Sequence, residues 1–195
     1  NLVGLAVAGV DPREDVVYRF AVLETPDVNA FAAPGGYIFV TRGALDLMES
    51  ESELAGVLGH EVGHVNRRHV VEQIRKSDTM RAVHDQANLN GSVLDKVVGN
   101  GASVLFTGLS RSDELEADSL GFEYAAAAGY DPNGLATFIG RLGSHAGQGP
   151  VADVMATHPR PADRLAQLQR IAERDKYPAG AILADRFRQS IPAHQ

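Results

Sequence analysis

Two histidines four residues apart, with a glutamate directly after the first, constrain this chain more than any other feature. They form the segment His60-Glu61-Val62-Gly63-His64. In a helix, residues four apart lie on the same face, so both imidazoles can bind one metal ion. Glu61 then lies where its carboxylate can act on a water molecule at that metal. The pattern predicts a zinc site of the kind used for peptide-bond hydrolysis.

The sequence around this motif predicts a long helix. Residues 50–53 (Ser-Glu-Ser-Glu) fit a capping box, from which we expect the helix to run to about residue 76. Gly56, Gly59 and Gly63 each disfavour a helix by about 1 kcal/mol relative to alanine. Three glycines in one helix indicate that a neighbour packs closely against it. We therefore expect this helix to run through the core.

A catalytic zinc needs a third protein ligand, and one candidate is a further histidine. The sixth position after His64 is Val70, so the spacing of a three-histidine site fails. His69 is one residue away and, at about 100° per residue, would point to the far side of the helix from His60. We expect His69 to be a surface or helix-packing residue.

A later acidic segment offers the other candidate. Residues 110–118 read Ser-Arg-Ser-Asp-Glu-Leu-Glu-Ala-Asp, so Glu114 and Asp118 are four apart and can both face the metal helix. We predict Glu114 as the third ligand and Asp118 as the hydrogen-bond partner of a zinc-binding histidine. Glu116 is rotated by about 200° from Glu114 and is the weaker candidate. Alone, such a pair is more often a solvated acidic face, but downstream of the histidine motif the metal-binding interpretation is favoured.

The rest of the pattern predicts an α+β fold, with a small N-terminal β layer packed on a mainly helical body. Alternating apolar, β-branched and aromatic residues predict strands at 15–24, 29–33 and 37–41. Capping and turn residues predict helices over 110–128, from 131 onward and over 159–176, and an irregular helical excursion over 77–108 that could serve as a lid. We expect one domain over residues 1–195, with a tail from residue 177.

Composition narrows the classes of partner. Eighteen basic and 25 acidic residues give a formal net charge of −7, which argues against nucleic acid or an anionic membrane surface as the main partner. No stretch approaches the roughly 20 apolar residues that a membrane span needs. The absence of cysteine excludes a thiolate zinc site and a cysteine nucleophile. Because the chain starts at Asn1, it is compatible with an upstream signal segment, anchor or flanking domain that is missing here.

The combination of motifs resembles the gluzincin peptidases related to the CAAX prenyl protease and HtpX, in particular their soluble, BepA-like bacterial branch. The resemblance covers about residues 15–172. Two of the matching residues, Arg111 and Arg164, are explained equally well by structural ion pairs and by a role in the site. The matching positions are residues 60–64, Ser110, Arg111, Glu114, Ala117, Asp118, Gly121, Asn29-Ala30-Phe31-Ala32, Tyr130-Asp131-Pro132, Thr157-His158-Pro159 and Arg164.

The resemblance implies roles that spacing alone does not. Residues Asn29, Ala30, Phe31 and Ala32 would form the edge strand that pairs with an extended polypeptide substrate; the alternative is a core strand. His158 would approach the zinc, either as an extra ligand in a latent form or as a stabiliser of the oxyanion. The alternative is a loop histidine that caps its neighbour. The family also implies a location in the bacterial cell envelope, in the periplasm for this branch.

We therefore predict a zinc metalloendopeptidase, with one Zn²⁺ per chain, that cleaves unfolded or misassembled proteins in envelope quality control. Glu61 would be the general base, and His158 would help to hold the oxyanion. One alternative is a latent zinc domain with a chaperone-like or binding role, although a purely structural zinc would have no use for Glu61. Another is a non-peptidase zinc hydrolase, which would not need a peptide-pairing strand.

Overall fold

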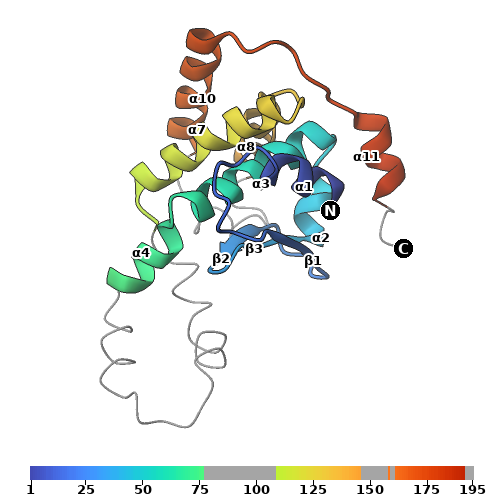
Figure 1. Ribbon diagram of the computed structural model, residues 1–195. Helices are drawn as coiled ribbons and strands as arrows, with labels where there is room; N and C mark the ends of the chain where they lie inside the picture. Colours follow the sequence, from blue (N-terminus) through green and yellow to red (C-terminus); the bar gives the residue numbers. More distant parts are fainter. Residues whose placement is uncertain (77–108, 146–157, 159–160, 192–195) are drawn as a thin grey trace.

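The computed structural model describes residues 1–76, 109–145, 158 and 161–191 (Figure 1). The expected α+β architecture is confirmed, since a small sheet lies against a mainly helical body. The predicted excursion over 77–108 lies outside the described residues, and none of the described helices is long and apolar enough to cross a membrane. The elements are α1 (Leu2–Ala8), β1 (Arg19–Leu23), β2 (Ala30–Ala33), β3 (Tyr37–Thr41), α2 (Arg42–Leu47), α3 (Glu51–Asn66), α4 (His69–Lys76), α7 (Arg111–Ala127), α8 (Gly134–Ser144), α10 (Pro161–Asp175) and α11 (Ala184–Ser190).

The sheet has the strand order β1-β3-β2, with β3 parallel to β1 and antiparallel to β2. This order places β2, the strand expected to bind substrate, at an edge of the sheet. Ala30 and Ala32 are buried, whereas Phe31 on the alternate face stacks on Phe39 with 5.1 Å between ring centroids. The alternation follows from the two-residue period of a strand.

Helix α3 contacts strands β2 and β3 of the sheet and also helices α1, α7 and α8 (Figure 1). A Cβ atom at Gly56 would lie 2.6 Å from the backbone nitrogen of Leu135 in α8. A Cβ atom at Gly59 would lie 2.9 Å from the carbonyl oxygen of Gly121 in α7. The close packing that the glycines indicate is therefore confirmed, and the neighbours are α7 and α8.

The expected extent of the motif helix is wrong at its C-terminal end. The helix begins as expected, since the Ser50 hydroxyl accepts a hydrogen bond from the backbone N–H of Glu53. It ends at Asn66, and α4 begins only at His69. Arg68 between them has φ +60°, a left-handed conformation that stops a helix and turns the chain. Because the helix is interrupted here, counting about 100° per residue from His60 does not give the direction of side chains from residue 69 onward.

Two apolar clusters hold α3 in place from different sides. One joins the sheet to α2, α3, α7, α8, α10 and α11, and the other joins α1, α3, α7 and the sheet. Helix α3, which carries the motif at residues 60–64, is therefore held in place by the core itself. The first cluster includes Val40, Leu45, Val57, Phe138, Ile139 and Leu168, and the second includes Val7, Ile38, Leu58, Val62 and Tyr124.

Two short helices were not predicted. The N-terminal segment is not only a β layer, because α1 precedes it and packs on α3 through Val3 and Val7. The expected tail from residue 177 contains α11, which buries Phe187 and forms an ion pair between Arg186 and Glu51. Each of these helices has seven residues and no side-chain cap at its N-terminus, so local sequence signals are weak.

Candidate metal centre

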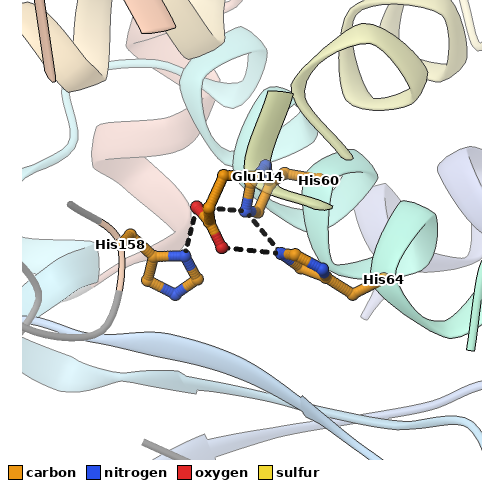
Figure 2. Close-up of side chains that lie close together, drawn as sticks. All are labelled: His60, His64, Glu114 and His158. Carbon is orange, nitrogen blue, oxygen red and sulfur yellow. Dashed lines mark hydrogen bonds and ion pairs between the residues drawn. The ribbon is translucent and has the colours of Figure 1, made fainter. Parts of the chain in front are cut away.

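Four buried side chains from three parts of the chain point toward one another (Figure 2). Helix α3 supplies His60 and His64, α7 supplies Glu114, and His158 precedes α10. The Nε2 atoms of His60 and His64 are 2.9 Å apart and lie 3.6 and 3.4 Å from the Glu114 carboxylate oxygens. One candidate ligand atom from each of the four residues lies within 4.8 Å of the others. The sequence-predicted ligands are thus brought together.

The donor set fits a metal ion. Two imidazoles and one carboxylate form a ligand set that zinc uses in catalytic sites. Within the described part of the chain, Oε1 of Glu114 is buried and accepts no hydrogen bond, although it faces Nε2 of His64. A buried carboxylate oxygen in this state is costly unless another group satisfies it, and a cation between these atoms would do so.

The protonation states of these residues also suit metal binding. Burial lowers the pKa values of His60 and His64, which favours their neutral forms. Burial opposes ionisation of Glu114, but the charge and hydrogen bond of His158 and the contacts with His64 and His60 hold the pKa of Glu114 well below its ordinary value. Neutral imidazoles and an ionised carboxylate are the forms that bind a metal.

Asp118 lies behind His60, one turn along α7 from Glu114. Its Oδ1 atom is 2.9 Å from Nδ1 of His60, so it meets the nitrogen that faces away from the cluster. Arg164 of α10 donates two hydrogen bonds to Asp118, of 2.8 and 2.6 Å. Burial opposes ionisation of Asp118, but the Arg164 guanidinium outweighs it and lowers the pKa of Asp118 to about 2. Arg164 is therefore part of an ion pair that supports the candidate site.

Glu61 lies beside the cluster rather than within it. It is 2% exposed and lines a cavity of about 30 Å³ together with Asn29, Ala30, His60 and His158. Most of the other residues that line this cavity are apolar, among them Val57, Leu135 and Phe138. Burial raises the pKa of the Glu61 carboxyl, which brings its basicity closer to neutral pH.

His158 connects the cluster to the edge strand. Its Nδ1 atom is 2.9 Å from Oε2 of Glu114, and its Nε2 atom is 3.4 Å from the carbonyl oxygen of Ala30 in β2. Burial acts to lower the pKa of His158, but the Glu114 carboxylate outweighs it and raises that pKa. The position is compatible with a fourth ligand and with a hydrogen-bond donor beside the ligand set.

A larger cavity, of about 300 Å³, opens beside β2 and α3. Its lining includes residues 32–36, at the C-terminal end of β2 and in the turn after it, and the candidate ligand His64. Arg13, Arg68 and Arg75 also line it.

The position of His69 was not predicted. This side chain is 7% exposed, and its Nδ1 atom lies 2.9 Å from Nδ1 of His64. The expectation that His69 points away from the site fails because α3 ends before it and Arg68 redirects the backbone. The only hint in the sequence was that His69 follows His64 by five residues, which keeps a third imidazole near the motif.

Comparison with known proteins assigns the family. Residues 4–172 match the sequence profile of peptidase family M48. The chain belongs to peptidase family M48. The metallopeptidase family expected from the motifs is thereby confirmed, and with it the class of enzyme.

The M48 chain is similar to metallopeptidases of both organelles and bacteria. It is 39% identical over 156 residues to the mitochondrial metalloendopeptidase OMA1 of Arabidopsis thaliana, an alignment that covers 79% of this chain and 31% of OMA1. It is 31% identical over 156 residues to the metalloprotease LoiP of Escherichia coli, covering 77% of this chain and 61% of LoiP. It is 25% identical over 180 residues to the beta-barrel assembly-enhancing protease of Escherichia coli, covering 85% of this chain and 37% of that protein. The chain thus spans from about a third to three fifths of these relatives' length.

Proposed function

We propose that this chain is a zinc endopeptidase domain that binds one Zn²⁺ through His60, His64 and Glu114. The observation that carries the proposal is the convergence of these three ligand side chains on one buried point, with Glu61 beside it. A metal-binding site alone does not need a buried carboxyl next to its ligands. A hydrolytic site does, because a base has to take a proton from the attacking water.

The chemistry is divided between the metal and the chain. Zinc, when bound, supplies a Lewis acid that polarises the scissile carbonyl and lowers the pKa of water. Glu61 would accept a proton from the attacking water and pass it to the leaving amine. The raised pKa of Glu61 supports both steps, since a more basic carboxylate accepts the proton more readily and holds it until transfer.

His158 and Asp118 would act on either side of the ligands. We propose that Asp118, held by Arg164, fixes His60 with its Nδ1–H outward and its Nε2 toward the metal. We propose that His158 stabilises the oxyanion of the tetrahedral species. Its place between Glu114 and β2 supports this role.

The substrate would be a polypeptide in an extended conformation that adds to the edge of the sheet at residues 29–32. The position of β2 at an edge, its contact with His158 and the neighbouring cavity of about 300 Å³ support this mode of binding. The similarity to a beta-barrel assembly-enhancing protease supports unfolded or misassembled envelope proteins as substrates, with the periplasm as location. We propose a single catalytic domain over residues 1–195.

Steady-state cleavage of casein tests the proposal. The wild-type chain loaded with zinc should cleave this unfolded protein. Glu61→Gln should bind the same amount of zinc and lose at least about 100-fold in kcat, because the carboxamide cannot accept the proton. Cleavage by Glu61→Gln at the wild-type rate would refute the assigned base.

A latent zinc domain is the second candidate, and the position of His158 favours it. The Nδ1 atom of His158 is 2.9 Å from Glu114, so the imidazole could occupy the fourth position at the metal instead of a water molecule. His158→Ala should raise basal cleavage if this histidine blocks the metal, and should lower kcat if it holds the oxyanion. Unchanged cleavage together with unchanged zinc affinity would exclude both roles.

A further inference from the structure

We propose that His69 is a positioning residue for the zinc ligand His64, and that Glu116 orients His69 in turn. The inference rests on the proposed metal site, but not on peptidase activity. Figure 2 shows His64 turned toward Glu114 and His60. Its other ring nitrogen, Nδ1, faces away from them and lies 2.9 Å from Nδ1 of His69.

The hydrogen-bond pattern admits one consistent assignment of ring hydrogens. If His64 binds the metal through Nε2, its hydrogen is on Nδ1, which then donates to His69. Nδ1 of His69 must therefore be an acceptor, and its hydrogen is on Nε2. That Nε2 atom is 3.2 Å from Oε2 of Glu116, which accepts the bond. Every link from Glu116 through His69 to His64 thus has one donor and one acceptor.

This arrangement gives each histidine ligand its own outer partner. Nδ1 of His60 meets the carboxylate of Asp118, and Nδ1 of His64 meets the imidazole of His69. A partner at that nitrogen keeps the other nitrogen free for the metal and fixes the plane of the ring. Without His69, the hydrogen of His64 could move to Nε2 and block metal binding.

The local backbone explains how His69 reaches this position. The left-handed conformation of Arg68 turns the chain back toward the last turn of α3, so that His69 lies against His64. The neighbouring Arg67 also forms an ion pair with Glu116, of 2.9 Å. Glu116 therefore contacts both Arg67 and His69. Variants of Glu116 and of Arg67 can separate the contact with His69 from the exposed ion pair.

Two nearly isosteric substitutions test the role of His69. His69→Asn keeps an acceptor near the position of Nδ1, whereas His69→Leu has a similar volume and no acceptor. We expect zinc affinity, measured by competition with a chromophoric chelator, to fall by about 10–100-fold in His69→Leu. It should stay within about threefold of the wild type in His69→Asn. Equal affinities of the two variants, whether both high or both low, would overturn the proposal.

Glu116 provides a second test that does not depend on a core substitution, because its side chain is 45% exposed. Glu116→Ala should weaken zinc binding several-fold and alter the visible spectrum of the Co²⁺-substituted protein. Arg67→Ala removes the ion pair to the same carboxylate and should leave both unchanged. If Arg67→Ala matches Glu116→Ala, the effect belongs to the surface ion pair and the proposed relay is wrong. Neither readout requires the chain to cleave peptides.

Discussion

Arg164 compensates the negative charge of the carboxylates that lie buried around the candidate metal ligands. Its guanidinium is buried, donates two hydrogen bonds to Asp118 and lies 3.7 Å from the Glu114 carboxylate. Without it, Asp118 would be an uncompensated charge in the core. Removing one partner of a buried ion pair typically costs about 3–5 kcal/mol.

We predict that Arg164→Met lowers the free energy of unfolding of the metal-free chain by about 3–5 kcal/mol, measured by urea denaturation. Arg111→Ala is the matched control, because Arg111 also forms an ion pair with a carboxylate, Asp163 at 3.2 Å, but is 59% exposed. The exposed pair should contribute less than about 1 kcal/mol. Similar losses in both variants would show that burial of the Arg164 pair has no special effect.

Asp118 should make the stability of the metal-free chain depend on pH in the acid range. Its pKa is about 2 in the folded chain and rises to its ordinary value, 3.8, on unfolding. The ionised carboxylate therefore stabilises the fold above about pH 4, and this contribution, on the order of 2 kcal/mol, disappears as the pH falls toward 2. The difference in free energy of unfolding between wild type and Asp118→Asn should shrink over that interval. A difference that stays constant from pH 5 to 2 would contradict the assignment.

At the residue scale, spacing alone was enough to select His60 and His64 on one helix and Glu114 and Asp118 on another as candidate site residues. The two residues of each pair are four apart and so lie on the same helix face. His69 could not be predicted in this way. Its side chain reaches His64 only because Arg68 adopts a left-handed conformation, and arginine carries no local signal for that conformation.

At the scale of elements, the crossing of α3 and α7 determines the distance between the ligands. The two helices approach closely at Gly59 and Gly121, where backbone meets backbone. A Cβ atom on Gly121 would lie 2.7 Å from the backbone nitrogen of His60, and backbone atoms cannot rotate away from it. Any side chain there would push Glu114 and the histidines apart.

We predict that Gly121→Ala lowers the melting temperature and weakens zinc binding, although alanine favours a helix by about 1 kcal/mol over glycine. Gly140→Ala in α8 is the control, because a Cβ atom there would have no atom of the described residues within 4 Å. It should raise stability by up to about 1 kcal/mol and leave zinc affinity unchanged. If both substitutions stabilise the chain, the helices are not in limiting contact at Gly121.

The elements themselves were largely predictable. Strands and long helices were expected close to their observed positions because alternation and capping residues report local structure directly. The end of α3 was not, since residues 67–68 contain neither glycine nor proline. The seven-residue helices α1 and α11 depend on packing against α3 and on the ion pair with Glu51, and neither contact is visible in local sequence.

At the scale of the whole molecule, the candidate site lies where α3, α7, the edge strand β2 and His158 meet. Spacing predicts what one helix presents, but not which distant segments pack together. The family resemblance, and not periodicity, anticipated that His158 approaches the candidate ligands, one of which, Glu114, is 44 residues away in the sequence. The contact of His158 with Ala30 was not predicted.

We propose that one zinc ion, held at this meeting point, makes the chain a peptidase. The most direct test is the initial rate of casein cleavage by the metal-free chain as zinc is added in known ratios. We expect no cleavage without metal, and a rate that rises linearly with added zinc and levels off at one zinc per chain. Full cleavage by the metal-free chain, or no cleavage at one zinc per chain, would contradict it.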